Sequence, residues 1–288
     1  MPKKILITGA NSYVGTSFER YMAQWPAEYQ IDTIDMIDGS WRTKPFAGYD
    51  VVFHVAGIAH VSADPKLKDL YYKINRDLAI ETAEKAKREG VNQFIFMSSM
   101  IIYGADEPIG KEKIITRETK PAPADFYGDS KLQADLAIQQ MVDDNFIVSI
   151  LRPPMIYGPG CKGNFPRLVE LSKYSIIFPN IENKRSILYI DNLSEAIKTL
   201  IDDCRRGIFF PQNKKTCATT EIIATLREIR GDSIFLFPLP CCATAILARL
   251  KLANKVFGSK IYAPDTAMAF SEPVSFCVGL KNIIEDEK

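Results

Sequence analysis

The sequence is poor in the residues that metal sites use most. Its 288 residues include two histidines, and its six cysteines show no C-x-x-C spacing, so we predict no metal site and expect reduced thiols. An excess of charge is absent as well, because 36 basic residues stand against 35 acidic ones and leave a formal charge of +1. This balance indicates neither a nucleic-acid partner nor a membrane-surface partner.

A long apolar run is also missing. The most apolar stretch, residues 234–250, is short for a membrane span and contains two prolines, so we predict a buried strand followed by a core or lid helix. Residues 1–8 lead directly into a strand-like run that is too short for the core of a signal peptide. We therefore expect a cytoplasmic protein.

Strand and helix patterns alternate through the first 150 residues. Short apolar runs predict strands, and segments with helical spacing lie between most of them. Residues 36–49 hold little regular pattern, which indicates an abbreviated connection. The alternation predicts an α/β fold with a doubly wound parallel sheet that binds its ligand at the carboxyl ends of the strands. The expected strands are 3–8, 30–35, 50–57, 93–99 and 146–151. Three helices are expected: one that ends near Trp25, one over 65–89, and one from Tyr127 to about Val142.

The composition shifts after residue 152, where prolines and glycines form a rigid loop. Further on we predict helices over 166–174 and 219–229, a strand over 207–211, and a helix through about Asp202 with Asp191 as its N-cap. We expect a cofactor-binding domain over residues 1–155, with segments near 186–203, and a smaller substrate-binding lobe from the remaining segments of 156–288.

A glycine turn joins the first strand to the first helix. Gly9-Ala-Asn-Ser-Tyr-Val-Gly15 points backbone N–H groups and the positive end of the helix at one spot, which suits a pyrophosphate. A tight turn without a ligand is the alternative. Asp35 follows the second strand, twenty residues after Gly15, where a carboxylate can bind the ribose diol of NAD and repel the 2′-phosphate of NADP. Asp32 and Asp38 lie close enough in sequence to compete for this role.

A possible catalytic group spans two segments. The strand over 93–99 ends in Ser98 and Ser99, and Tyr127 precedes Lys131 by one helical turn. A lysine beside a phenol favours the phenolate, so we predict a lowered pKa for Tyr127. Such a tyrosine can exchange a proton with a sugar or alcohol hydroxyl. A solvated helix face is the alternative interpretation of the tyrosine–lysine spacing.

Together these segments resemble the extended short-chain dehydrogenase/reductase family, and within it the nucleotide-sugar epimerase/dehydratase branch. The loop over 9–15 is similar to the family's G-x-x-G-x-x-G, with Ser12 in place of the middle glycine. Residues 98–104 match S-S-x-x-x-Y-G, 127–131 match Y-x-x-x-K, and 152–160 match R-P-x-x-x-Y-G-P-G. The resemblance implies a Rossmann-type sheet with a smaller C-terminal substrate-binding lobe.

The resemblance also implies roles for individual residues. Tyr127 would be the catalytic acid/base, Lys131 would lower its pKa and bind the nicotinamide ribose, and Ser99 would hold the reacting oxygen. The expected cofactor-binding residues are Gly9, Asn11, Ser12, Tyr13, Val14, Gly15, Asp35, Ala56, Gly57, Asn75, Tyr127, Lys131 and Pro154. The expected substrate-binding residues are His60, Ser99, Asn164 and Arg185, of which Asn164 and Arg185 lie in segments that resemble diphosphate-binding ones.

The implied activity is NAD-dependent chemistry at C4 of a UDP-hexose, most simply that of a UDP-sugar 4-epimerase. A 4-reductase of a UDP-4-keto-6-deoxy sugar is a close alternative, and a non-catalytic NAD-binding regulator is a remote one. A 4,6-dehydratase is disfavoured because Met100, Ile101 and Ile102 follow Ser99 where that group has an acidic pair. The resemblance further implies a homodimer that forms through the helices around 66–89 and 127–142.

Overall fold

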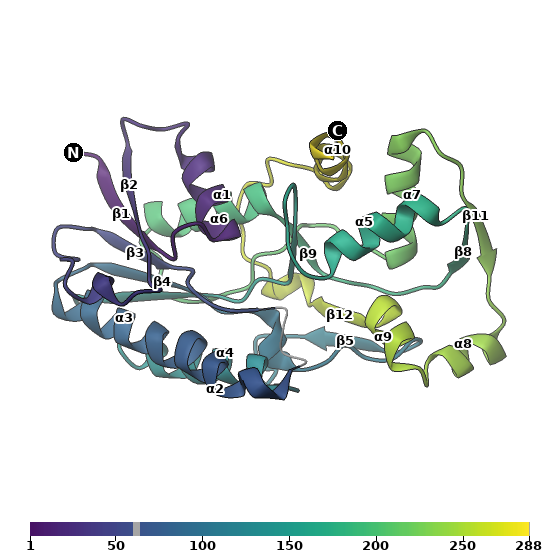
Figure 1. The fold of residues 1–288 in the computed structure, drawn as a ribbon, viewed down its shortest axis with the longest axis horizontal. Coiled ribbons are helices and arrows are strands. Elements are labelled where there is room, and N and C mark those ends of the chain that lie inside the picture. The colour runs from purple at the N-terminus through teal and green to yellow at the C-terminus, as the bar shows by residue number, and fades with distance from the viewer. Residues whose placement is uncertain (60–63, 288) are drawn as a thin grey trace.

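A six-stranded parallel sheet forms the centre of the protein in the computed structural model, which describes residues 1–59 and 64–287 (Figure 1). The strand order is β10-β6-β4-β3-β1-β2, so the chain leaves β1 toward β2 on one side and places β3 on the other. This reversal creates the crevice in which doubly wound folds bind ligands. The predicted fold class is thus confirmed. The strands are β1 (Lys3–Thr8), β2 (Tyr29–Ile34), β3 (Val51–His54), β4 (Gln93–Met97), β6 (Ile147–Leu151) and β10 (Gly207–Phe209).

Helices cover both faces of this sheet (Figure 1). Ile5 and Phe53 pack with α1 (Tyr13–Met22) and α6 (Ile190–Asp202), whereas alternate residues such as Leu6 pack with α3 (Leu78–Arg88) and α4 (Phe126–Gln139) on the other face. Because both faces are buried, the central strands carry continuous runs of buried residues, such as Ile5–Thr8 in β1 and Val51–His54 in β3, instead of a buried residue at every second position.

The connection over 36–49 contains no strand, as predicted. A short 3-10 turn (Ser40–Arg42) follows β2, and Trp41 and Phe46 are fully buried against the face that α3 covers. Two aromatic side chains therefore cover apolar surface where a doubly wound fold usually has a helix and strand.

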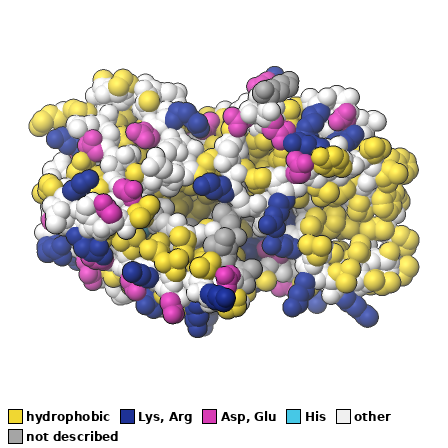
Figure 2. All heavy atoms as spheres, viewed as in Figure 1, with side chains coloured by type: hydrophobic (Ala, Val, Ile, Leu, Met, Phe, Trp, Pro, Cys, Tyr) yellow, Lys and Arg dark blue, Asp and Glu magenta, His cyan; other side chains and the backbone are white. Residues whose placement is uncertain are grey.

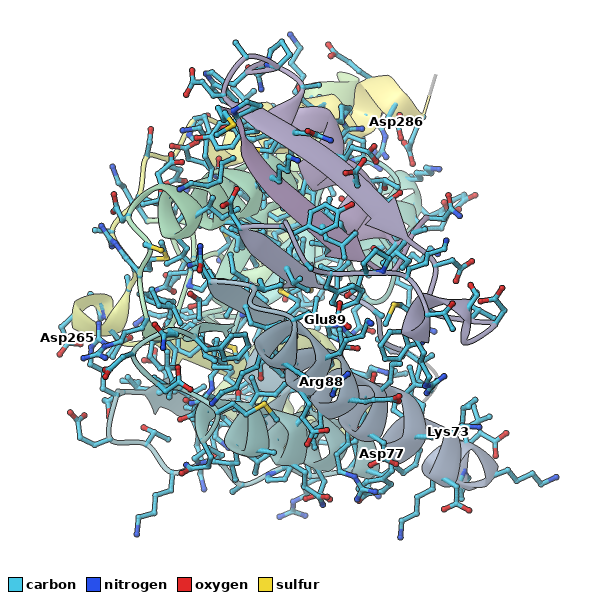
Figure 3. All side chains as sticks on the ribbon, turned by 90° about the vertical axis from the view of Figure 1, so that its left-hand side faces the viewer. Lys73, Asp77, Arg88, Glu89, Asp265 and Asp286 are labelled. Atoms are coloured by element: carbon cyan, nitrogen blue, oxygen red, sulfur yellow. The ribbon has the colours of Figure 1, made fainter. Side chains whose placement is uncertain are left out.

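The helix predicted over 65–89 is a single helical path with changes of pitch. A 3-10 turn (Pro65–Leu67) leads into α2 (Lys68–Tyr71), a π-helical segment (Tyr72–Asp77) and α3. Figure 3 shows Lys73, Asp77, Arg88 and Glu89 along this path. Gly90 ends it with a φ of +80°, a conformation that favours glycine.

The smaller lobe combines segments from both halves of the chain. Strand β5 comes from the first half and pairs with β12, which lies near the C-terminus. We propose that residues 1–155 with 186–209 form the cofactor-binding part, apart from β5, and that the remaining segments form a substrate-binding lobe. The elements outside the main sheet are β5 (Glu112–Ile115), β7 (Met155–Tyr157), β8 (Ile177–Asn180), β9 (Ile187–Tyr189), β11 (Phe235–Pro238), β12 (Ser259–Tyr262), α5 (Phe165–Tyr174), α7 (Thr219–Arg230), α8 (Cys241–Leu247), α9 (Lys251–Phe257) and α10 (Phe276–Asp286).

Two local predictions are wrong. Asp191 lies in the first turn of α6 and Tyr189 is the N-cap residue, because β9 runs directly into the helix. The predicted strand and helix within 234–250 are present as β11 and α8, but they are not buried in the core, since the side chains of β11 and those described in α8 are partly or fully exposed; the alternative of a lid helix stays a prediction. Within residues 1–59 and 64–287, none of the helices has the length and hydrophobicity needed to cross a bilayer.

Candidate active site

A cavity of about 630 Å³ lies at the carboxyl ends of the central strands. Its wall combines the loop before α1, the ends of β3 and β4, the start of α4, and segments of the smaller lobe. Many of the residues selected from the sequence line this cavity, although they come from distant parts of the chain. They are Ser12, Tyr13, Val14, Gly57, Ser99, Tyr127, Lys131, Pro154, Asn164 and Arg185.

The loop before α1 depends on two glycines and one serine. Gly9 has a φ of +108°, and a Cβ at this position would lie 2.8 Å from the backbone nitrogen of Ala56. Ser12 is the N-cap of α1: its Oγ accepts a hydrogen bond from the N–H of Gly15 (3.1 Å), and its backbone is extended. A serine in place of the family's middle glycine is therefore unstrained here and satisfies one free N–H of the helix.

Asp35 lies next to this loop. The carbonyl of Ile34 accepts hydrogen bonds from the N–H groups of Gly9 and Ala10 (2.9 and 3.1 Å), which brings the end of β2 against the loop. The Asp35 carboxylate is exposed and accepts from the N–H of Ile37 (2.8 Å). This position favours Asp35 as the ribose-binding acid.

The two competing acids have other partners. Asp32 lies within β2 and accepts a hydrogen bond from the Tyr49 hydroxyl (2.9 Å), and Asp38 accepts from the N–H of Ser40 (2.9 Å). Neither is adjacent to Ile34, the residue that contacts the glycine loop, so the geometry favours Asp35 over both.

Asn75 holds the part of the cavity wall that follows β3. It lies in the π-helical segment and is fully buried, and its amide both accepts from the N–H of Ile58 (2.9 Å) and donates to the carbonyl of Ile58 (3.0 Å). A Cβ on Gly57 would lie 2.9 Å from Asn75 Oδ1 and 3.3 Å from Lys131 Nζ. Asn75 thus fixes the chain after β3 where a cofactor can approach closely, and the π segment directs it there, as such segments often do at functional sites.

The side chains of Ser99 and Tyr127 line the same cavity, where the Ser99 hydroxyl favours the phenolate and acts to lower the pKa of Tyr127. Ser99 follows β4, where its Oγ accepts from the N–H of Ile101 (3.2 Å), and Tyr127 lies in the first turn of α4 with its ring edge-on to Tyr71. Burial, followed by the nearby Tyr71 and Asp125, raises the pKa of Tyr127 to about 12. The phenol is therefore protonated at neutral pH.

The prediction that Lys131 lowers the pKa of Tyr127 is wrong for this arrangement. The Lys131 Nζ donates to the carbonyl of Met97 (2.9 Å) and lies over the ring of Phe96, where burial lowers its own pKa to about 8. Lys131 still carries most of its charge at pH 7, but its ammonium is held at the Met97 carbonyl, and the burial of Tyr127 decides the direction of the shift in the tyrosine pKa.

We expect the Lys131→Met variant to be more stable than the native protein by about 1–3 kcal/mol at pH 7, because one pKa unit corresponds to about 1.4 kcal/mol and the buried cation is removed. The folded-state pKa is below the unfolded one, so the cost of protonated Lys131 is complete below pH 8 and fades as the pH rises toward 10.5. Urea unfolding at pH 7 and pH 9.5 should show the advantage shrinking. An equal advantage at both values would contradict the assignment to this lysine.

A buried ionic network lies directly behind the cavity, and the sequence reasoning missed it. Asp135 of α4 is fully buried and accepts from Arg152 Nε and Nη2 (2.9 and 2.8 Å) and from the Ser98 hydroxyl (2.6 Å). Arg152 Nη1 also donates to the hydroxyl of Tyr103 (2.7 Å). Ser98 thus holds the end of β4 to α4, while its neighbour Ser99 faces the cavity. A signal was present, since Ser98, Tyr103 and Arg152 all occur in the motifs.

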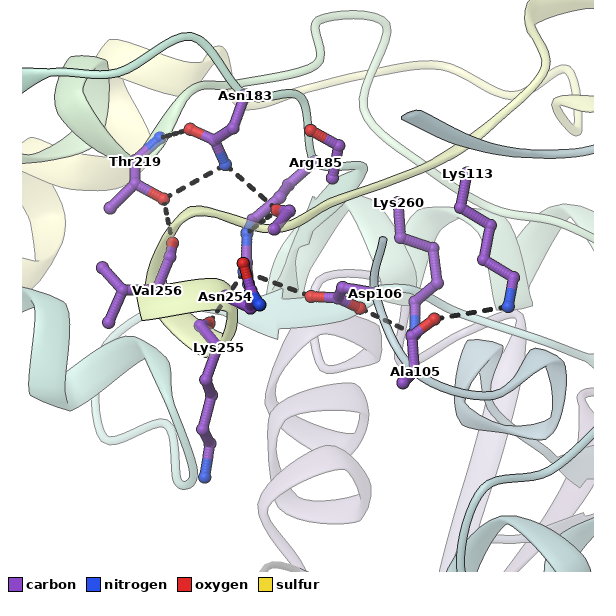
Figure 4. A network of polar contacts seen from close by, with 12 residues as sticks. Ala105, Asp106, Lys113, Asn183, Arg185, Thr219, Asn254, Lys255, Val256 and Lys260 are labelled. Atoms are coloured by element: carbon purple, nitrogen blue, oxygen red, sulfur yellow. Dashed lines mark hydrogen bonds and ion pairs between the residues drawn. The ribbon is translucent and has the colours of Figure 1, made fainter. Parts of the chain in front are cut away.

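Arg185 reaches the lobe end of the cavity, but its side chain is already paired (Figure 4). Its guanidinium donates to the carbonyls of Gly258 (3.1 Å) and Lys255 (2.8 Å) and forms an ion pair with Asp106 (3.1 Å). Lys260 pairs with the same carboxylate (2.9 Å). Burial would raise the pKa of Asp106, but Lys260 and Arg185 outweigh it and hold the pKa below its ordinary value.

The other selected residues differ in position. Asn164 is exposed and precedes α5, so it is free to meet a ligand at the rim. Asn11 has a φ of +64° at the exposed start of the loop. Gly9 packs against the backbone of Ala56. His60 lies outside the described residues. His54 is buried between Phe94 and Phe96, and burial lowers its pKa to about 3.

The parallel sheet, the glycine loop and the grouped serine, tyrosine and lysine define an extended short-chain dehydrogenase/reductase. The chain belongs to the NAD dependent epimerase/dehydratase family, whose model matches residues 5–209. It is an NAD-dependent enzyme, which sets aside the interpretation as a non-catalytic regulator.

Known proteins of this family resemble the chain over most of its length. A UDP-glucose 4-epimerase of Vibrio cholerae is 30% identical over 281 residues, which cover 90% of this chain and 83% of the relative. An N-acetyl-alpha-D-glucosaminyl-diphospho-ditrans,octacis-undecaprenol 4-epimerase of Escherichia coli O157:H7 is 25% identical over 83% of this chain and 76% of the relative. The solved UDP-glucuronic acid 4-epimerase of Bacillus cereus, in complex with NAD, shares the fold with a TM-score of 0.75 and 20% identity, over 99% of this chain and 100% of that one.

Proposed function

We propose that the protein interconverts a UDP-hexose and its C4 epimer. The observation that carries this proposal is the meeting of Ser99, Tyr127 and Lys131 in one cavity whose other end is formed by the smaller lobe. The similarity to the Vibrio cholerae UDP-glucose 4-epimerase over most of both chains supports the choice of substrate class.

The residues at the carboxyl edge of the sheet fit NAD. Gly9 leaves no Cβ between the loop and Ala56, the first turn of α1 faces the cavity, and Asp35 lies beside the same loop. We propose that Gly9, Asn11, Ser12 and Gly15 surround the pyrophosphate and that Asp35 holds the adenosine ribose. The remaining contacts to the cofactor would come from Tyr13, Val14, Ala56, Gly57, Asn75, Tyr127, Lys131 and Pro154.

When bound, NAD supplies the acceptor and donor of a hydride. The chain itself moves the proton: the phenolate form of Tyr127 takes it from the C4 hydroxyl, and the resulting phenol later returns it, while Ser99 keeps the reacting oxygen next to Tyr127. Lys131 lies one helical turn from Tyr127 and beside Gly57, where it can bind ribose hydroxyls. At the lobe end, Asn164 and Arg185 would contact the diphosphate. His60 is proposed from the sequence alone as a residue that lines the substrate pocket.

A single reduction of a UDP-4-keto-6-deoxy sugar is the second candidate. It is favoured by one observation: with a pKa of about 12, Tyr127 is protonated and ready to act as a general acid. An acid is what the reduction of a ketone needs, whereas removal of a hydroxyl proton needs the phenolate.

A substrate panel separates the two candidates. The purified protein is incubated with UDP-glucose, UDP-N-acetylglucosamine and a UDP-4-keto-6-deoxy sugar, with and without NADH, and products are resolved by chromatography and NMR. Interconversion of epimers without net consumption of NADH supports the epimerase. Stoichiometric loss of NADH with the keto sugar alone would replace it by the reductase.

We expect the Asp35→Ser variant to bind NAD about tenfold more weakly, because a charge-assisted hydrogen bond to the ribose diol is lost. The variant should also bind NADP better than the native protein does, since the carboxylate no longer repels the 2′-phosphate. Titration calorimetry with both cofactors measures the change. Asp32→Ser, within β2 just before Asp35, is the matched control, and an equal loss in both variants would argue against a specific role of Asp35.

We also propose a cytoplasmic homodimer that forms through the helices around 66–89 and 127–142. Leu70 and Leu136 lie in these helices and are about half exposed, so each helix presents an apolar side chain to solvent. Sedimentation velocity of the native protein and a Leu136→Glu variant tests this interface.

A further inference from the structure

One face of the smaller lobe is apolar and uncovered. Figure 2 shows hydrophobic side chains gathered over the right-hand end of the molecule, with basic side chains along the lower margin. We call this surface the lobe face. It contains Ile176 (65% exposed), Ile177 (63%), Phe235 (65%), Ile246 (64%), Leu250 (51%) and Leu252 (76%).

The lobe face is built from elements that cannot bury these side chains within the chain. Strands β8 and β11 form a sheet of only two strands, in which Ile177 and Phe235 are direct partners, and both are largely exposed. In α8, every side chain described is exposed or half-exposed, although the helix has no charged residue. An apolar face of this kind marks a contact with another apolar phase or molecule.

The segment that contributes α8, α9 and β11 to the lobe face carries charge of one sign. Residues 233–264 contain four basic residues and no acidic residue. Lys260 is turned inward and pairs with Asp106, while Arg249, Lys251 and Lys255 are exposed beside the apolar side chains. The nearest acidic residue before this stretch, Asp232, lies 3.8 Å from Arg227. The net charge of the whole chain is close to zero, but this stretch has a local excess of positive charge.

We propose that the lobe face docks the protein onto the surface of an anionic lipid bilayer. Apolar side chains that enter the boundary between headgroups and acyl chains, with cations around them, are the combination that binds such a surface. A second copy of the chain fits less well, because a symmetric contact would place Arg249, Lys251 and Lys255 near their own copies without an acid in the same stretch. The expectation of no membrane-surface partner rested on the total charge, which does not report this local pattern.

The lobe face is connected to the cavity by α9. Leu252 and Lys255 lie on this helix, and the backbone carbonyls of Lys255 and Gly258 at its end hold the guanidinium of Arg185. Figure 4 shows the Lys255 side chain pointing away from this network. One helix thus presents side chains to the bilayer and carbonyl groups to the substrate end of the cavity, so docking orients that end with respect to the membrane.

Sedimentation with vesicles tests the proposal on the full chain. We expect the protein to bind vesicles of phosphatidylcholine with 30% phosphatidylglycerol at least tenfold more tightly than vesicles of phosphatidylcholine alone. High salt should weaken the binding, because it screens the cations. The double variant Leu250→Glu/Leu252→Glu should lose at least tenfold in binding to the anionic vesicles. Substitution of Arg249, Lys251 and Lys255 by Gln should remove the preference for anionic lipid.

Val278→Glu is the matched control, because Val278 is about half exposed on α10 and lies outside the lobe face. It should bind vesicles like the native protein. Circular dichroism of every variant checks folding, and vesicle binding is read independently of sugar turnover, so the proposed enzymatic activity can fail without affecting this result. Equal binding by the native protein and the Leu250/Leu252 variant would overturn the proposal. Loss of self-association in that variant, with no vesicle binding by the native protein, would assign the face to a second copy.

Discussion

Replacing Tyr127 by phenylalanine is expected to lower turnover about a thousandfold, within the range that general acid–base catalysis contributes. The substitution removes the hydroxyl, which shares the cavity with Ser99, and leaves the ring, which packs edge-on against Tyr71. The fold and the binding of NAD should therefore persist. Turnover is measured with the UDP-sugar that the substrate panel identifies, and NAD binding by titration calorimetry.

Tyr72→Phe is the matched control for this experiment. The Tyr72 hydroxyl donates to Asp129 at 2.5 Å and lies outside the cavity wall, so its loss should leave turnover within about twofold of the native value. A Tyr127→Phe protein with full turnover would refute the proposed proton transfer. A parallel loss of NAD binding would show that the hydroxyl serves the cofactor and not the chemistry.

Replacing Arg152 by methionine is expected to lower the free energy of unfolding by about 3–5 kcal/mol, because it leaves the carboxylate of Asp135 buried without its cation. Asp135 is fully buried and Arg152 is 5% exposed, so water cannot take over the two hydrogen bonds that are lost. The hydroxyl of Tyr103 loses a donor at the same time. Urea unfolding followed by circular dichroism measures the change.

The double variant Arg152→Met/Asp135→Leu should recover most of this loss, since two apolar side chains of similar volume replace the pair. Arg205→Met provides the surface comparison: Arg205 pairs with Asp203, both side chains are more than a third exposed, and the expected loss is below about 1 kcal/mol. If Arg152→Met cost no more than Arg205→Met, the buried network would not be what holds the end of β4 to α4.

The sheet was predictable because apolar runs and glycine turns, the patterns that indicate its strands, each lie within a short stretch of sequence. In β1 the residues from Ile5 to Thr8 are buried and in β3 all four residues are buried, since helices cover both faces, and the glycine loop follows β1 directly. Gly9 requires a positive φ and close contact with Ala56, so its residue type reports its surroundings. The same holds for the abbreviated connection over 36–49, where the absence of a pattern corresponds to the absence of a strand.

Side-chain environments were less predictable. Spacing on a helix brings Tyr127 and Lys131 together, but their pKa values depend on burial and on the carbonyl of Met97, which arrives from β4. The strand and helix expected within 234–250 are present, but their expected burial was wrong for a related reason. Hydrophobicity indicates that a segment avoids water, and it does not indicate which phase or partner covers the segment.

The sequence by itself determined the order of strands and helices, the glycine loop, and the residue types that stand at the strand ends, because these follow from backbone requirements and short-range periodicity. Only the tertiary structure decided that Asn75 holds the chain at Ile58, that Ser98 turns to Asp135 while Ser99 turns to Tyr127, and that Arg185 is paired with Asp106. Each of these contacts joins groups from different elements, and their energies depend on burial, which no short stretch of sequence contains.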